Sequence, residues 1–228
     1  MNVRRIDLST YPRRSHFEHF LTMANPFTGV TVNVDITDWL RWQQSSGYPF
    51  FLCFQYAAVH AANRVPQLRQ RIVDGGICEY DFCDPSYIVS LPDGTYRYCL
   101  AHARQPLAPY IEQARRSQAR AMAAEGLEEE GDPLGQLFIT CLPWLTFTSL
   151  QIPWSDAAFS NPGISWGRFE RHSRLVLRDG EIVESPSFTL PVNITVNHAL
   201  VDGIHIARFF ACLDEELVKM RKSGPDGG

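Results

Sequence analysis

Residues 192–210, VNITVNHALVDGIHIARFF, join an apolar, strand-like run to a helical pattern through the dipeptide Asp202-Gly203. The apolar run that ends at Asn197 predicts a strand, and the apolar residues beyond Gly203 recur at the spacing of an amphipathic helix. His198 therefore follows the last strand directly. Because a strand that ends in a turn presents its last side chain at the rim of the sheet, His198 lies where a substrate could reach it.

Two interpretations of His198 are open at this level. A neutral imidazole with a pKa near 6.5 suits proton abstraction at neutral pH, so His198 is a candidate general base. Alternatively, His198 is a hydrogen-bonded rim residue, and Asp202 only caps the helix that begins near Gly203. Asp202 could also hold the turn through a salt bridge to an arginine elsewhere. Gly203 is expected to allow a tight turn that a Cβ would obstruct.

The composition is that of a globular protein and argues against several other classes of protein. The chain has 228 residues, 45% of them hydrophobic and 20% charged, with a formal net charge of −4. No clustered basic face favours nucleic-acid binding. No apolar run reaches the roughly 18–20 residues that a membrane-spanning helix needs, and the charged start of the chain does not resemble a signal peptide. We therefore expect no nucleic-acid partner, no membrane association and a cytoplasmic location.

Six cysteines are spread along the chain without metal-binding spacing. None forms a CxxC pair, and the sequence suggests no metal site. Most of them lie in apolar or strand-like segments, which predicts buried free thiols in a reducing compartment. The six are Cys53, Cys78, Cys83, Cys99, Cys141 and Cys212.

Periodicity and turn residues predict one α/β domain with a mixed sheet. Helices are expected over residues 49–65, 107–125 and from Gly203 on, and Thr37 is expected to cap a short helix from Asp38. Strands are expected over 28–36, 68–73, 77–80, 87–90, 95–100 and 187–197, with a strand pair or kinked strand in 136–152 interrupted by Pro143. Residues 173–185 predict a hairpin that turns at Asp179-Gly180.

Four segments resemble the type A chloramphenicol acetyltransferases in the same order along the chain. NHALVDGIHIARFF, residues 197–210, resembles the His-His-Ala-x-x-Asp-Gly-x-His run that closes the family's last strand. YPRRSHFEHF (11–20), VDIT (34–37) and LPWLTFTSL (142–150) resemble other family segments. The resemblance spans about residues 2–220. It implies a single chloramphenicol acetyltransferase-like domain over 1–221, a two-layer sandwich whose mixed sheet is covered by helices, and a flexible tail over 222–228.

The resemblance also implies roles for individual residues. His198 matches the family's general base, which takes the proton of the acceptor hydroxyl while the oxygen attacks the thioester carbonyl of acetyl-CoA. Asp202 matches an aspartate that pairs with an N-terminal arginine, here Arg13, to support the turn at Gly203. Thr140 stands where the family has a serine that stabilises the oxyanion. A threonine hydroxyl can still donate, although Thr140 could equally be a β-favouring strand residue.

The acceptor pocket and the assembly are implied in the same way. Family pockets are lined by aromatic residues, and the matching positions are Phe20, Thr28, Tyr96 and Tyr98, while Ser165 matches a family threonine that holds a water. The hairpin over 174–185 looks like an insertion and weakens the match at Ser165. The family is trimeric, with the histidine of one subunit facing the pocket of the next. A trimer would account for exposed-looking aromatics such as Trp144, Trp154 and Trp166.

The resemblance favours an acetyl-CoA-dependent O-acetyltransferase acting on chloramphenicol, which would confer antibiotic resistance, with no metal. One alternative is an acyltransferase for another small alcohol. The related dihydrolipoamide acyltransferases share the histidine motif, but this chain has no lipoyl domain. Another alternative is a non-catalytic trimeric homologue, because Thr140 and Asn197 depart from the family pattern.

Overall fold

A mixed β-sheet organises the molecule in the computed structural model, which describes residues 2–127, 131–153 and 159–223. Within these residues the sheet has seven strands, in the order β2-β10-β8-β7-β5-β6, with β9 paired to β10. Strands β5, β7 and β8 run parallel to one another, and the other pairs are antiparallel. The strands are β2 (Phe27–Asp35), β5 (Asp84–Ser90), β6 (Tyr96–Leu100), β7 (Gln136–Cys141), β8 (Gly163–Trp166), β9 (Glu170–Arg178) and β10 (Glu181–Asn197).

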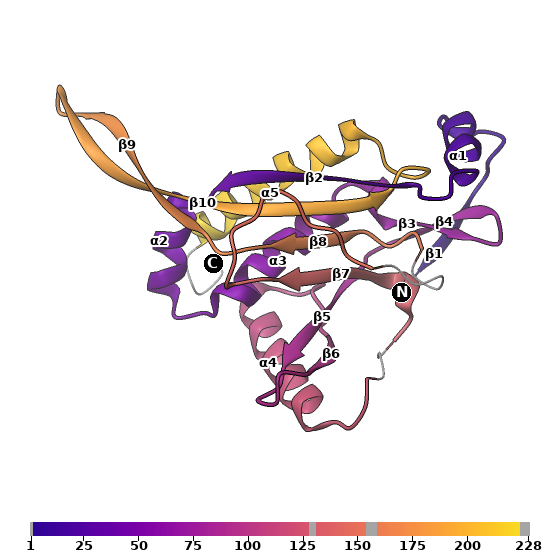
Figure 1. Cartoon of the computed structure of the whole chain (residues 1–228), viewed down its shortest axis with the longest axis horizontal. Helices are drawn as coiled ribbons and strands as arrows, with labels where there is room; N and C mark the ends of the chain where they lie inside the picture. The colour runs from indigo at the N-terminus through magenta and orange to yellow at the C-terminus, as the bar shows by residue number, and fades with distance from the viewer. Residues whose placement is uncertain (1, 128–130, 154–158, 224–228) are drawn as a thin grey trace.

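Helices cover one face of this sheet, as Figure 1 shows. The covering helices are α2 (Thr37–Ser46), α3 (Phe50–Asn63), α4 (Leu107–Ala123) and α5 (Gly203–Ser223). The short helix α1 (Arg14–Leu21) lies beyond one end of β2 and β10. A separate antiparallel sheet contains β1 (Val3–Ile6), β4 (Gly76–Tyr80) and β3 (Gln70–Val73), and two 3-10 turns cover Pro66–Arg69 and Pro133–Gly135. The predicted α/β class, mixed sheet and helical cover are confirmed.

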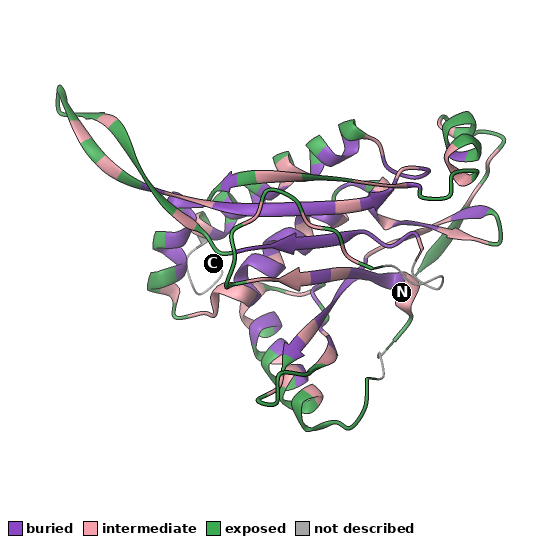
Figure 2. Cartoon of the chain, viewed as in Figure 1, coloured by how far each residue is buried: buried purple, intermediate pink, exposed green. Residues whose placement is uncertain are grey.

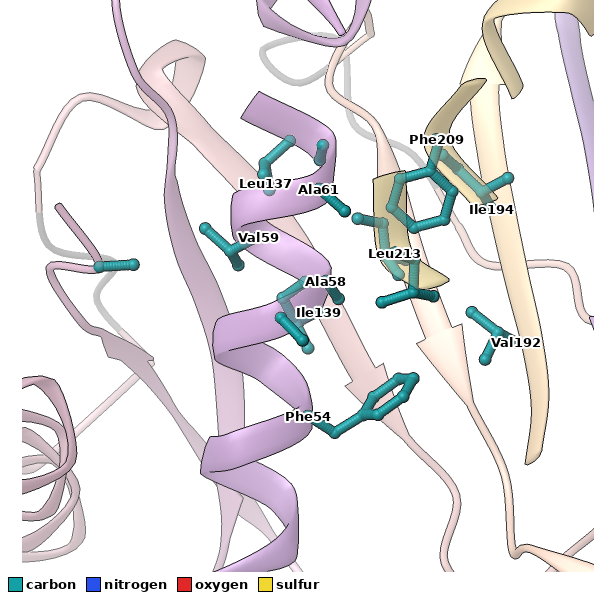
Figure 3. Close-up of a cluster of buried hydrophobic side chains, with 14 of the residues drawn as sticks. Phe54, Ala58, Val59, Ala61, Leu137, Ile139, Val192, Ile194, Phe209 and Leu213 are labelled. Carbon is teal, nitrogen blue, oxygen red and sulfur yellow. The ribbon is translucent and has the colours of Figure 1, made fainter. Parts of the chain in front are cut away.

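The main core lies between the sheet and its central helices. Helix α3 is apolar on nearly all sides because α5, α4 and the sheet all pack against it. Figure 3 shows the contact: side chains from α3 and α5 meet alternate residues of β7 and β10. The labelled residues are Phe54, Ala58, Val59, Ala61, Leu137, Ile139, Val192, Ile194, Phe209 and Leu213. Because strand side chains alternate between faces, the residues between these on β7 and β10 point away from the helices.

Strand β10 is the longest strand among the described residues, with 17 residues, and its two halves have different surroundings. Its second half is central, because β2 pairs along one side over residues 189–197 and β8 pairs along the other over 192–195. Its first half pairs only with β9 and extends away from the body as a long hairpin (Figure 1). The hairpin turns at Asp179-Gly180, both with positive φ, as the Asp-Gly dipeptide predicts.

Several local predictions need correction. Thr37 is the first helical residue of α2 and not its cap; its hydroxyl instead accepts a hydrogen bond from the amide of Phe188. Residues 142–153 form no strand after β7, because the chain leaves the sheet at Leu142 and passes through a turn. The predicted strand over 68–73 begins as a 3-10 turn and becomes a strand only at Gln70.

Two surface predictions also differ from the structure. Trp166 is completely buried among aromatic residues of α3, whereas Trp144 is exposed and Trp154 lies outside the described residues. The predicted tail from Lys222 overlaps the end of α5 at Ser223, and residues 224–228 lie outside the described residues. All six cysteines are free as expected, but three are only half-buried: Cys78, Cys141 and Cys212.

Candidate active site

The turn after β10 is held by an arginine from the start of the chain. Arg13 lies just before α1, and its guanidinium donates to the carbonyl of Leu200 and, at 3.5 Å, to that of His198. The same guanidinium lies 3.5 Å from the Asp202 carboxylate. The predicted partners Arg13 and Asp202 are therefore close together, and the arginine also satisfies backbone groups of the turn. Positioning of the turn thus depends on a residue far away in sequence.

His198 has a defined tautomer and a defined ring orientation. Its Nδ1 lies 2.8 Å from the carbonyl oxygen of Val201, which can only accept, so Nδ1 carries the hydrogen. In the neutral ring this leaves a lone pair on Nε2. Phe20 of α1 stacks on the imidazole at 4.0 Å between ring centroids. The backbone amide of His198 donates to the carbonyl of Pro26, which ties the turn to the start of β2.

Asp202 and His205 complete the turn on its other side. One Asp202 carboxylate oxygen accepts from the amide of Gly203, and this bond, helped by Arg13, holds the carboxyl pKa below its usual value. The amide of Asp202 donates to Nδ1 of His205 at 2.9 Å, so His205 is neutral in this arrangement. Burial, with Arg13 and Arg208 nearby, lowers the pKa of His205. His205, to which the sequence assigns no chemical role, thus holds the turn.

Gly203 is at the predicted place but not for the predicted reason. A Cβ added there would meet nothing within 4 Å, and its φ lies outside the left-handed region. Space and backbone strain therefore do not demand glycine at this position.

Asn197 is a turn residue that the sequence did not identify. Its side-chain oxygen accepts from the amide of Ala199 at 3.0 Å, and its amide nitrogen donates to the carbonyl of Phe159 at 3.2 Å. The side chain is buried. An asparagine directly before a turn, where it can bond the amide two residues on, is the sequence signal that could have identified this role.

Three other predicted residues lie in one row across the sheet, on the face away from the helices. Thr140 on β7 is directly beside Ser165 on β8, and Ser165 is opposite Asn193 on β10. Tyr98 on β6 continues the same row beyond β5. The row ends at Thr31, whose hydroxyl accepts from the Asn193 amide at 3.1 Å. Asn193 and Thr31 were not predicted, although the alternation of polar and apolar residues in VNITVN marks Asn193.

The side chains of this row differ in how exposed they are to solvent. Ser165 is only 1% exposed, so no small molecule can touch its side chain in this conformation. Thr140 and Tyr98 are half-buried. Tyr96 lies two residues before Tyr98 on the same face of β6, with the two rings 5.8 Å apart, and is exposed.

The row and the histidine turn are distant within one chain. Thr140 is two strands away from β10, about 10 Å, and His198 lies five residues beyond Asn193, about 17 Å along the strand. Phe20 stays with the His198 group. Thr28, opposite Val196 on β2, is at the His198 end and on the helix-covered face. The predicted site residues therefore form two groups, one around His198 and one around Thr140.

The described residues place neither a reactive thiol nor a cluster of metal-ligating side chains beside these two groups. Burial raises the pKa of the thiol of Cys141, next to Thr140, to about 12, so the thiol is not a nucleophile at neutral pH. Within residues 2–127, 131–153 and 159–223, no three His, Cys, Asp or Glu side chains gather as a metal site would require. A cavity of about 370 Å³ between β2, α2 and α5 includes neither His198 nor Thr140. In the same residues, no helix combines the length and apolarity of a membrane span.

Known proteins are similar to this chain in sequence and in fold. A sequence model described as chloramphenicol acetyltransferase matches residues 1–214. Chloramphenicol acetyltransferase 2 of Escherichia coli is 29% identical over 217 residues, which cover 93% of this chain and 96% of that protein. A solved chloramphenicol acetyltransferase structure aligns with a TM-score of 0.75 at 22% identity, covering 95% of this chain and all of the other. A probable dihydrolipoamide acetyltransferase from Listeria monocytogenes aligns with a TM-score of 0.64 at 16% identity, covering 95% of each chain.

The fold is therefore the one found in the solved chloramphenicol acetyltransferase and in the probable dihydrolipoamide acetyltransferase. Because the family model covers nearly the whole chain, the protein belongs to the chloramphenicol acetyltransferase family. It is an acetyltransferase of that family, which uses acetyl-CoA as co-substrate.

Proposed function

We propose that this protein transfers the acetyl group of acetyl-CoA to a hydroxyl of chloramphenicol, with His198 as the general base. The hydrogen bond from His198 Nδ1 to the carbonyl of Val201 is the observation that carries the proposal. It keeps the proton on Nδ1, so the lone pair on Nε2 is free to accept a proton from an alcohol. Phe20 and the Arg13-bound turn hold the ring in this orientation.

The reaction follows from that orientation. His198 Nε2 takes the proton of the acceptor hydroxyl while the oxygen bonds to the thioester carbonyl carbon. The carbonyl oxygen becomes an oxyanion, and its collapse breaks the carbon–sulfur bond. The departing CoA sulfur takes the proton from the imidazolium, which returns His198 to its neutral form. The raised pKa of Cys141 argues against an acyl-enzyme at the thiol beside Thr140.

Thr140 is the proposed donor to the oxyanion, and it acts together with His198 of another copy of the chain. Within one chain the two residues are separated by two strands and five residues of β10, on the order of 20 Å. A hydroxyl must lie about 3 Å from the oxyanion to stabilise it. An oligomer in which the His198 turn of one subunit faces the Thr140 row of the next would join the two groups, and a trimer is the arrangement we propose.

The acceptor is the least constrained part of the proposal. Relatives at 25–29% identity are named for chloramphenicol, which makes it the first acceptor to test. Another small alcohol is the alternative. Asn197, which motivated a non-catalytic homologue, supports the catalytic proposal instead, because its side chain fixes the turn that carries His198.

Release of CoA thiol tests the proposal directly. The full-length protein is mixed with acetyl-CoA and, in separate reactions, chloramphenicol and a panel of small alcohols. We expect thiol release that depends on the acceptor and is lost in His198→Ala. Release with another alcohol but not with chloramphenicol would identify the alternative acceptor. No acceptor-dependent release with any alcohol, from protein that binds acetyl-CoA, would contradict the proposal.

A further inference from the structure

The segment that carries Arg13 lies at the surface of the molecule. Within α1, which begins at the next residue, only Phe17 is buried, and Figure 2 shows most of this helix exposed. Arg13 nonetheless donates to the carbonyls of Leu200 and His198, inside the turn that carries the proposed general base. Because the segment is mostly exposed, polar contacts are needed to fix the position of the guanidinium.

A row of polar side chains crosses the small sheet of β1, β4 and β3 and ends beside this segment. Arg4 on β1 is opposite Glu79 on β4, and Glu79 is opposite Gln70 on β3. The Glu79 carboxylate lies 3.4 Å from Arg4 and accepts from Nε2 of Gln70 at 3.3 Å. Gln70 is only 3% exposed, and its Oε1 accepts from the hydroxyl of Tyr11 at 3.1 Å. The row therefore ends at a side chain two residues before Arg13.

The Glu79 carboxylate determines the direction of each hydrogen bond in this row. A carboxylate only accepts, so the amide nitrogen of Gln70 faces Glu79 and its oxygen faces Tyr11. The Tyr11 hydroxyl must then donate to Gln70, which leaves its oxygen lone pairs for another donor. Burial raises the pKa of Tyr11, and Arg13 beside the hydroxyl opposes that rise as a cation and as a hydrogen-bond donor. The guanidinium of Arg13 is therefore the donor that faces these lone pairs.

We propose that Tyr11 is a positioning residue for the acetyl transfer. Its hydroxyl, which Gln70 holds from the small sheet, fixes the guanidinium of Arg13, and Arg13 holds the turn that carries His198. The small sheet thus serves the active site through a row of hydrogen bonds. This inference rests on the proposed role of His198 as general base. Because Tyr11 acts through Arg13, its loss changes how His198 is oriented and leaves the imidazole itself in place.

Steady-state kinetics of Tyr11→Phe, which removes the hydroxyl and keeps the ring, test the effect on turnover. We expect kcat to fall about three- to tenfold with KM for acetyl-CoA nearly unchanged, because a misplaced catalytic group slows the reaction without weakening binding. The control Tyr80→Phe removes the same group from the other face of β4, where it donates to Asp132 at 2.9 Å, and should turn over like the wild type. Equal kcat of Tyr11→Phe and the wild type, or an equal fall in Tyr80→Phe, would overturn the proposal.

A double-mutant cycle tests whether Tyr11 acts through Arg13. In an Arg13→Met background, Tyr11→Phe should lower kcat by less than about twofold, because the guanidinium that the hydroxyl positions is already gone. A further fall as large as the one in the wild-type background would show that Tyr11 affects the site by another route. That result would overturn the proposed connection through Arg13.

Amide hydrogen exchange reports on the turn without any turnover. The amides of Leu200 and Val201 both donate to the carbonyl of Asn197 within the turn. In Tyr11→Phe we expect these amides to exchange at least about threefold faster, while the amides of α3 keep their rates, because only the turn loosens. Tyr80→Phe should exchange like the wild type. Unchanged exchange at the turn would overturn the positioning role. A wild type that releases no CoA thiol would refute the proposed function alone, because the exchange measurement does not depend on activity.

Discussion

The two ends of β10 differ in how many groups fix them. At the end near His198, the Arg13 side chain and the backbone carbonyls of Pro26 and Phe159 bond the turn, and β2 and β8 pair along both sides of the strand. At the other end, β9 alone pairs with the strand, and large aliphatic side chains stay exposed. One strand thus combines a rigid support for chemistry with an extension that one neighbouring strand holds.

Replacing one histidine near each end of β10 by alanine gives the largest expected difference in turnover. His198→Ala removes the proposed general base, so turnover should fall by about 10²–10⁴ or more, with acetyl-CoA binding nearly unchanged. His172→Ala on the hairpin of β9 and β10 removes an exposed imidazole that hydrogen-bonds the Thr189 hydroxyl, far from the His198 turn, and turnover should stay near wild type. Steady-state kinetics and equilibrium binding measure both. A His198→Ala enzyme that keeps more than about a tenth of the activity is incompatible with the proposed role.

Substitutions of Thr140 test the proposed oxyanion donor, which belongs to the second group of site residues. Thr140→Val keeps the branched shape and removes the donor, so turnover should drop about 10²-fold with little change in acceptor KM. Thr140→Ser keeps the hydroxyl and should retain or raise turnover. If Thr140 is only a strand residue, valine should be tolerated at least as well as serine. Equal turnover of the valine variant and the wild type would end the oxyanion proposal.

Removing Arg13 or Asp202 measures how firmly the turn is fixed. Arg13→Met leaves the carbonyl of Leu200 without its partner, and unfolding free energy should fall by about 1–3 kcal/mol. Asp202→Asn should cost less, below about 1 kcal/mol, because the Asp202 side chain is 46% exposed. Chemical denaturation checks the order, and a larger loss for Asp202→Asn would contradict it.

Acid should weaken the turn through His205. Its pKa is lowered in the folded state, so its neutral form contributes stability that is present above the unfolded pKa of about 6.5 and is lost as pH falls below it. The lowered pKa of Asp202 has the same sign at more acidic pH. Buried His60 also has a lowered pKa, so the difference between wild type and His205→Asn isolates one histidine. Denaturation curves that shift equally with pH in both proteins would contradict this role.

The sequence predicted the elements whose signals are local. Helix α3 is apolar on all sides, the Asp179-Gly180 dipeptide specifies a hairpin turn, and the change of period after Gly203 marks α5. The predictions were wrong where the structure of a segment depends on its contacts with distant parts of the chain. Residues 142–153 contain β-favouring types, but the chain leaves the sheet there, and no local signal shows which strand has a neighbour.

The candidate site was predictable in part for the same reason. His198, Arg13 and Asp202 came from motif matches, and the structure brings them together. Asn193 and Thr31 joined the Thr140 row only once the register of four strands was known, because neighbours across a sheet are far apart in sequence. Asn197 and His205 support the turn through backbone contacts, which a side-chain motif does not specify.

The bond from Arg13 to Leu200 joins residues 187 positions apart, and it has a consequence for how the chain folds during synthesis. Strand β10 occupies an inner position of the sheet but is the last strand to be made, so until it emerges, the facing edges of β2 and β8 have no partner. Long-range pairings of this kind slow folding and leave strand edges open to aggregation. A nascent chain therefore has neither a closed sheet nor an oriented histidine until its last fifth is in place.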